Sequence, residues 1–158
     1  DALKDEDQLD LRMKFCLLLG TYVKRCANLM LIADKQDMLS TDELYISVNE
    51  SFEYMSFLGV ECELKSGRQL LLPSQKIIAA YDLFEAVIES GLEGMRAGLV
   101  HIAPDERIVM VMETDQDSVD IERDHLLETL KNAGLSLSAE IADDMHRFTL
   151  YTGGVSNA

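Results

Sequence analysis

Two glutamates four residues apart, Glu85 and Glu89, stand in the segment YDLFEAVIESGLEGM at residues 81–95. Side chains with this spacing lie on one face of a helix, one turn apart. Asp82 and Glu93 extend the same face, so the segment carries a stripe of carboxylates. Because carboxylate oxygens are good Mg²⁺ ligands, the stripe has two interpretations. It is either the metal-binding helix of an ATP site or the solvated face of an ordinary helix.

Other residues that could do chemistry are scattered along the chain. His101, His125 and His146 fall on a predicted strand, a predicted helix and a predicted hairpin, and we expect each to be a structural or surface histidine. The sequence contains neither a P-loop nor a GxSxG motif. Its three cysteines form no CxxC pair, which favours a reducing, cytoplasmic environment.

Charge and composition narrow the classes of function. The 158 residues carry a formal net charge of −15, which argues against binding to nucleic acid or to an anionic membrane surface. Hydrophobic residues make up 47% of the chain, enough for a folded domain. No uninterrupted apolar run reaches about 18 residues, so we expect no membrane span and no direct membrane contact.

A long helix is predicted over residues 9–37. One apolar stripe follows a heptad pattern, with alternating steps of three and four residues, through Cys16, Leu19, Val23, Cys26, Met30 and Ala33. A second stripe beside it contains Phe15, Leu18, Tyr22, Leu29 and Ile32. Because the combined face is wider than a two-stranded coil needs, it suits a helical bundle between two copies of the chain. The alternative is a single buried helix of a monomer.

The remaining chain alternates between helical and strand patterns. Ser40 is a predicted N-cap, with Glu43 completing a capping box, and Gly59 ends that helix. We then expect, in order, a hairpin or a strand with a loop (59–73), a helix (74–90), two strands (99–103 and 107–113) around a tight turn at 104–106, a helix (119–133) and a last hairpin around 143–144. This order predicts an α+β fold, with a mixed, largely antiparallel sheet covered on one face by helices.

From about residue 41 to 152 this order resembles the catalytic ATP-binding domain of bacterial sensor histidine kinases, of the GHKL type. AAYDLFEAVIESGL stands where that family has its N box, GLVHIAPDERIVMVMETD resembles the following strand pair, and HLLETLKNAGLSLSAEIADDMHRFTLYT resembles the closing helix and hairpin. YVKRCANLMLIAD, in the long helix, is similar to the helix that joins the dimerisation region to the ATPase domain. The resemblance implies a site for ATP and Mg²⁺.

The chain departs from the family at the residues that would hold the nucleotide. Glu85 matches the N-box glutamate, but Glu89 replaces the asparagine that ligates magnesium, and Glu93 stands where a basic residue is usual. Asp115 or Asp117 occupies the region of the adenine-reading aspartate, without the glycines that follow it in the family. We expect only about five residues between the second strand (107–113) and the helix that follows it, too few for an ATP lid. Residues 1–58 contain no histidine, so the long helix offers no phosphoacceptor.

Three hypotheses follow. The first is the cytoplasmic part of a two-component sensor protein with a degraded nucleotide site, and hence no cofactor. It would comprise a dimerisation or connector helix (1–38), an ATPase-like domain (39–153) and a disordered tail (154–158). It would form a homodimer through residues 9–37 and contact a response regulator or another signalling protein. The second is an active kinase domain in which Glu85 and Glu89 bind Mg²⁺ and Asp115 reads adenine. The third is a non-enzymatic acidic interaction module.

Overall fold

The structure is a computed structural model that describes residues 2–102, 105–117, 119–122 and 125–153. In chain order it contains α1 (Ala2–Ala33), β1 (Met38–Ser40), α2 (Thr41–Phe57), β2 (Glu61–Ser66), β3 (Leu71–Pro73), α3 (Ser74–Gly91), β4 (Met95–Ile102), β5 (Arg107–Thr114), α4 (Leu126–Asn132), β6 (Ser136–Ala142) and β7 (Met145–Tyr151). The main sheet has five strands in the order β2-β4-β5-β7-β6, and β1 and β3 form a separate small sheet.

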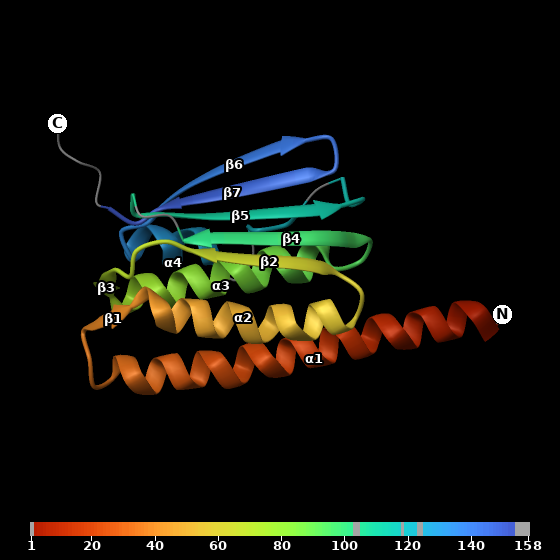
Figure 1. Cartoon of the computed structure of the whole chain (residues 1–158), viewed down its shortest axis with the longest axis horizontal. Helices are drawn as coiled ribbons and strands as arrows, with labels where there is room; N and C mark the ends of the chain where they lie inside the picture. Colours follow the sequence, from red (N-terminus) through yellow and green to blue (C-terminus); the bar gives the residue numbers. More distant parts are fainter. Residues whose placement is uncertain (1, 103–104, 118, 123–124, 154–158) are drawn as a thin grey trace.

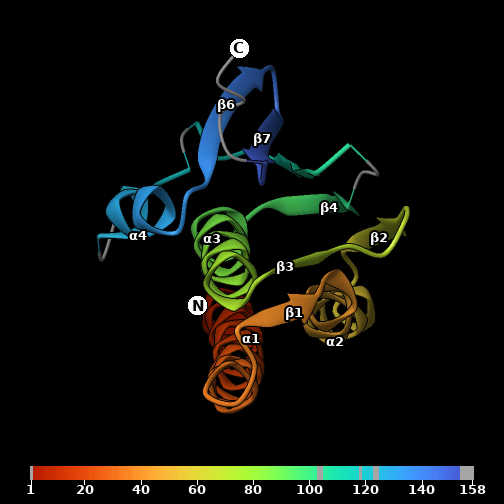
Figure 2. The ribbon, with the colours of Figure 1, turned by 90° about the vertical axis from the view of Figure 1, so that its left-hand side faces the viewer.

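The helices gather on one face of the five-stranded sheet (Figure 1). The end-on view shows α2, α3 and α4 against the sheet, with α1 as an additional layer beneath α2 and α3 (Figure 2). β2 pairs with β4 in parallel, whereas β4–β5, β5–β7 and β6–β7 are antiparallel. The predicted α+β fold, with a mixed and largely antiparallel sheet covered on one face, is therefore confirmed.

Helix α3 is the centre of the core. Its predicted apolar face is confirmed, since Ile77, Tyr81, Phe84 and Ile88 are all buried. Removing such a side chain from water contributes about 1.5–3 kcal/mol. Because α3 is covered by the sheet on one side and by α1 on the other, its polar face is also enclosed, and this placement matters for the carboxylate stripe.

Helix α2 begins and ends as its sequence predicts. The Ser40 hydroxyl accepts a hydrogen bond from the backbone N–H of Asp42, 3.0 Å away, and so caps the first turn. At the other end Gly59 has φ of +91°, and the Val60 N–H donates to the Met55 carbonyl. This left-handed residue satisfies a terminal carbonyl and ends the helix.

Helix α1 differs from its prediction in length and in which stripe it buries. It covers Ala2–Ala33 rather than 9–37, because residues 2–8 are mostly good helix formers and the chain turns after Ala33 to reach β1. The second stripe faces the domain, with Leu18 and Leu29 each 2% exposed. The heptad stripe is largely exposed in the single chain, as at Val23 (59%).

By length and composition alone, α1 is apolar enough to cross a membrane, with a mean hydropathy of 1.4 in its most apolar stretch, of which 17% is buried. The expectation of no span rested on uninterrupted apolar runs, and charged residues interrupt this stretch.

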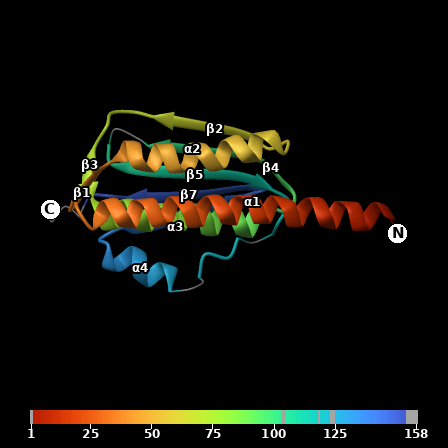
Figure 3. The ribbon, with the colours of Figure 1, turned by 90° about the horizontal axis from the view of Figure 1, so that it is seen from below.

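Two basic residues of α1 hold it against α2. Lys24 Nζ lies 2.8 Å from a carboxylate oxygen of Glu50 in α2, and Arg25 pairs with the same carboxylate. Seen from below, α1 runs along α3 between α2 and α4 (Figure 3).

Three other boundaries are corrected. Of the two alternatives for residues 59–73, the hairpin is wrong, since β2 pairs with β4 and β3 pairs with β1. The strand followed by a loop is closer to the structure, with the short β3 added after the loop. β4 begins at Met95 rather than 99. The predicted helix at 119–133 is only Leu126–Asn132, because the Asp120 side chain accepts a bond from the Glu122 N–H and holds a non-helical turn. The predicted tail 154–158 and residue 104 of the predicted turn lie outside the described residues.

Candidate functional site

Three carboxylates of the predicted stripe line one cavity. Asp82, Glu85 and Glu89 of α3 face it, and its volume is about 280 Å³. Helix α1 contributes Leu19 and Tyr22 to its walls, and α4 contributes Leu126 and Thr129. The structure therefore brings Glu85 and Glu89 together, as the i, i+4 spacing predicts. The cavity is slightly smaller than the range of about 300–1,000 Å³ typical of small-molecule pockets.

The cavity is not open to solvent as a helix face would be. Glu85 is only 2% exposed, and Asp82 and Glu89 are partly buried. The stripe is therefore partly or fully buried from Asp82 to Glu89, whereas Glu93 beyond the end of α3 is exposed. This enclosure follows from α1 lying against the same face of α3, which the sequence pattern of α3 alone does not reveal.

Tyr22 fixes α1 to the acidic face. Its hydroxyl donates a hydrogen bond of 2.8 Å to Asp82 Oδ1, and its ring lies 5.7 Å from that of Tyr81. Burial raises the pKa of Asp82 above its ordinary value, although the bond from Tyr22 acts in the opposite direction. Burial, together with the neighbouring Asp82, also raises the pKa of Tyr22. Both groups are therefore disposed to remain neutral more readily than in water.

Metal binding by the stripe stays a prediction. Within the described ranges, no group of three or more His, Cys, Asp or Glu side chains is arranged to hold a metal ion. The described lining of the cavity also includes no lysine or arginine. Oxygen ligands for Mg²⁺ need near-octahedral geometry, so two carboxylates would leave most positions to water or to a nucleotide.

Asp115 lies apart from the glutamates. It follows the end of β5, is exposed, and is absent from the described lining of the cavity. A Cβ built on Gly94, whose φ is +76°, would come within 1.8 Å of Asp115 Oδ1, so this carboxylate packs over the turn between α3 and β4. The connection from β5 to α4 runs from 115 to 125, longer than the five or so residues expected, because α4 begins late.

The histidines occupy structural or surface positions in the described chain. His101 is partly exposed on β4, and His125 precedes α4 with its Nδ1 3.8 Å from Glu128. His146 is fully buried on β7, and its Nε2 lies 3.1 Å from the Gln116 carbonyl oxygen. None of these histidines lines the carboxylate cavity.

Sequence reasoning missed the residues that enclose the cavity. The sequence pattern puts Tyr22 in an apolar stripe, and nothing local marks it as the partner of Asp82, 60 residues away. Leu126 and Thr129 were also missed, since α4 reaches α3 only through the tertiary fold. A tyrosine inside an otherwise apolar stripe is the one usable signal, because a buried hydroxyl needs a polar partner.

Comparison with known proteins shows the fold. No family model matches the sequence, and no curated protein sequence matches it. Among solved structures, a bacterial phosphotransferase is 12% identical with a TM-score of 0.56, covering 90% of this chain and 96% of its own. The Acinetobacter baumannii histidine kinase AdeS is 13% identical with a TM-score of 0.51, and the match covers 85% of this chain and 77% of AdeS.

The histidine kinase domain of the Erythrobacter litoralis EL346 blue-light activated histidine kinase has a TM-score of 0.54 at 9% identity, covering 89% of this chain and 82% of its own. At such low identity the likeness concerns the fold alone. The chain shares its fold with these histidine kinase structures, as its sequence resemblance implied.

Proposed function

We propose that this chain is the cytoplasmic, histidine-kinase-like part of a two-component sensor protein, with a degraded nucleotide site, and that it acts in signalling through protein contacts. The observation that carries the proposal is the carboxylate cavity at the N-box position, which is small, acidic and walled by α1. A triphosphate could enter this cavity only if α1 moved away, because Leu19 and Tyr22 form one of its walls. The proposed division is a connector helix (1–38) and an ATPase-like domain (39–153).

The proposed partners are a second copy of this chain and a response regulator. On α1, the face directed away from the domain carries a second heptad pattern, since the exposed Leu9, Met13, Cys16, Gly20, Val23, Ala27 and Met30 follow alternating steps of four and three residues. A Cβ on Gly20 would meet nothing within 4 Å in the single chain. A glycine in the middle of a helix lowers helix stability by about 1 kcal/mol relative to alanine. Close approach of a second helix at Gly20 would explain why a glycine occupies this position.

The second candidate function is an ATP- and Mg²⁺-dependent kinase domain with an unusual N box. It is favoured by one observation, namely that Glu85 and Glu89 face the same cavity. It would require α1 to move away from α3, because Leu19 and Tyr22 form one wall. A third candidate, a non-enzymatic acidic module, is favoured by the net charge of −15.

Isothermal titration with ATP and a non-hydrolysable analogue, with and without Mg²⁺, separates these candidates. We expect no heat of binding at millimolar nucleotide for the wild type. Micromolar, Mg²⁺-dependent binding that is lost in Glu85→Ala or Glu89→Ala, but retained in Glu128→Ala on the exposed face of α4, would instead establish the kinase candidate. The Glu128 variant controls for the loss of one negative charge elsewhere.

A further inference from the structure

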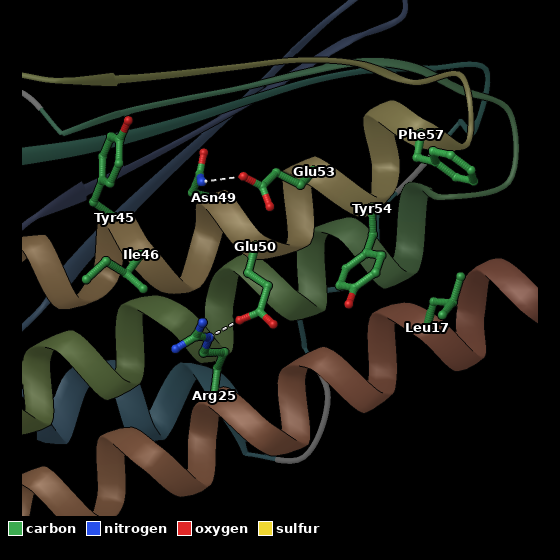
Figure 4. A pocket seen from close by; sticks show the side chains of 9 residues that line it. All are labelled: Leu17, Arg25, Tyr45, Ile46, Asn49, Glu50, Glu53, Tyr54 and Phe57. Carbon is green, nitrogen blue, oxygen red and sulfur yellow. Dashed lines mark hydrogen bonds and ion pairs between the residues drawn. The ribbon is translucent and has the colours of Figure 1, made fainter.

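A groove of about 770 Å³ is lined by residues of α1 and α2, and it shares no lining residue with the carboxylate cavity. Its apolar lining comes from Leu17 of α1 and from Ile46, Tyr54 and Phe57 of α2. Tyr54 points from α2 toward α1, beside Leu17, and Phe57 stands at the far end of α2 (Figure 4). Most of the lining therefore comes from one face of α2, and α1 contributes only Leu17 and Arg25.

The apolar residues of this groove are unusually exposed for a folded domain. Phe57 is 90% exposed, Ile46 45% and Tyr54 41%. They recur along α2 at steps that keep them on one helical face, and the distance from Ile46 to Phe57 corresponds to roughly 16 Å, or three turns. Exposed aromatic side chains grouped in this way are typical of protein interaction sites, where they act as anchors.

The charged residues that α2 gives to the groove are both acidic, namely Glu50 and Glu53, whereas α1 contributes Arg25. Helix α2 contains Asp42, Glu43, Glu50 and Glu53 but no lysine or arginine. Lys24 and Arg25 of α1 pair with Glu50, and these contacts lower the pKa of that carboxyl. Glu53 accepts a hydrogen bond of 3.1 Å from the Asn49 amide, and within the described residues no cation pairs with it.

We propose that this groove binds an amphipathic helix of another protein, one whose apolar face is flanked by lysine or arginine. The apolar face would cover Ile46, Tyr54 and Phe57, and a flanking cation would reach Glu53. Helix-in-groove binding of this kind uses apolar anchors at one-turn spacing, and opposite charge at the rim fixes orientation and speeds association.

A second copy of this chain is a poorer occupant. The first turns of α1, which extend beyond the domain in Figure 1, expose Leu3 and Leu9, but Asp5, Glu6, Asp7 and Asp10 flank them. Docking this segment in the groove would bring its acids close to Glu53, and like charges in contact weaken binding. A partner with lysine or arginine in place of these acids would not meet this repulsion. The groove is separate from the carboxylate cavity, so the docking proposal goes beyond the proposed function and holds whether or not nucleotide binds.

The test uses a synthetic peptide as the probe, the helical leucine–lysine sequence LKKLLKLLKKLLKL, with binding followed by fluorescence anisotropy of a labelled copy. We expect Ile46→Asp and Phe57→Asp each to weaken binding about tenfold, because each removes an apolar anchor. The matched control is Ile141→Asp on β6, where a 60% exposed isoleucine is replaced. Added negative charge alone would strengthen binding of a cationic peptide, so weakening at the groove is opposite to a non-specific effect.

Two further controls complete the test. The acidic peptide LEELLELLEELLEL is expected not to bind, and Glu53→Gln should weaken binding of the basic peptide about threefold while Glu140→Gln on β6 leaves it unchanged. The proposal is overturned by any of three results. The Phe57→Asp and Ile141→Asp variants bind the basic peptide equally well, the two peptides bind equally well, or the basic peptide does not bind. Loss of self-association in the groove variants, measured by sedimentation, would overturn it in favour of a second copy as the occupant. Circular dichroism checks that every variant is folded.

Discussion

At the scale of single residues, the contact between Tyr22 and Asp82 joins the long helix α1 to α3, two helices whose contact the sequence pattern does not predict. The hydroxyl-to-carboxylate distance is 2.8 Å, and the two residues belong to α1 and α3. Because Asp82 is partly buried, its remaining polar contacts are limited and this bond satisfies one of its oxygens. The bond therefore positions α1 over the acidic face.

Replacing Tyr22 with phenylalanine tests this role. The variant leaves a partly buried carboxylate without its hydroxyl donor, so we expect the free energy of unfolding to fall by about 1–2 kcal/mol. Urea denaturation at neutral pH measures the change. Tyr54→Phe is the control, since that side chain is 41% exposed and is expected to change stability by less than about 0.5 kcal/mol. Equal effects of the two substitutions would contradict the account.

Asp82→Asn tests the raised pKa. A carboxyl whose pKa is higher in the folded state binds its proton more tightly there, so folding is favoured as the pH falls through the folded pKa. The asparagine variant lacks this titration but keeps an oxygen to accept the Tyr22 bond. We therefore expect the variant to be more stable than the wild type near neutral pH, with the difference shrinking by about pH 4. A difference in unfolding free energy that stays constant with pH would contradict the shift.

The glutamates and Asp115 show how far local sequence reasoning reaches. The placement of Glu85 and Glu89 in one cavity follows from helical periodicity, which is a local property. The enclosure of that cavity does not, because Tyr22 and Leu126 reach it from distant segments. The placement of Asp115 depends on how β5 ends beside Gly94, and no spacing rule specifies this contact.

At the scale of elements, α1 packs against α2 and α3 through its buried side chains. Leu29→Ala removes a side chain that is 2% exposed, and we expect a loss of about 2–4 kcal/mol in the free energy of unfolding. The neighbouring Met30 is 56% exposed and points away, so Met30→Ala should cost less than about 0.5 kcal/mol in the monomer. Chemical denaturation of both variants at low protein concentration provides the comparison. Similar losses for the two would mean that α1 does not pack as described.

Elements differed in how well the sequence predicted them. The strong periodicity of α3 and the capping residues of α2 located both helices closely. The short β1 and β3 carry no recognisable alternation, and their pairing is set by the tertiary fold. The sequence of 119–133 has helical composition, yet the Asp120 turn and the left-handed His125 (φ of 59°) delay α4 to Leu126.

At the scale of the whole molecule, the outward face of α1 carries the proposed dimer. Val23→Asp would place a charge in the centre of that face, so we expect the dimer to dissociate at least tenfold more readily, without loss of monomer stability. Sedimentation equilibrium measures the association. Ile141→Asp, at an exposed site on β6, should leave it unchanged. A Val23→Asp chain that associates like the wild type would place the dimer contact elsewhere.

The most direct test of the central claim is hydrogen exchange of the backbone amides of α1 and α3, with and without millimolar ATP and Mg²⁺. If α1 is an integral wall of a cavity that holds no nucleotide, residues 17–33 will exchange as slowly as those of α3, and nucleotide will change neither rate. Exchange in α1 at the rate of an unfolded chain, or slower exchange in α3 on addition of ATP and Mg²⁺, would contradict the account.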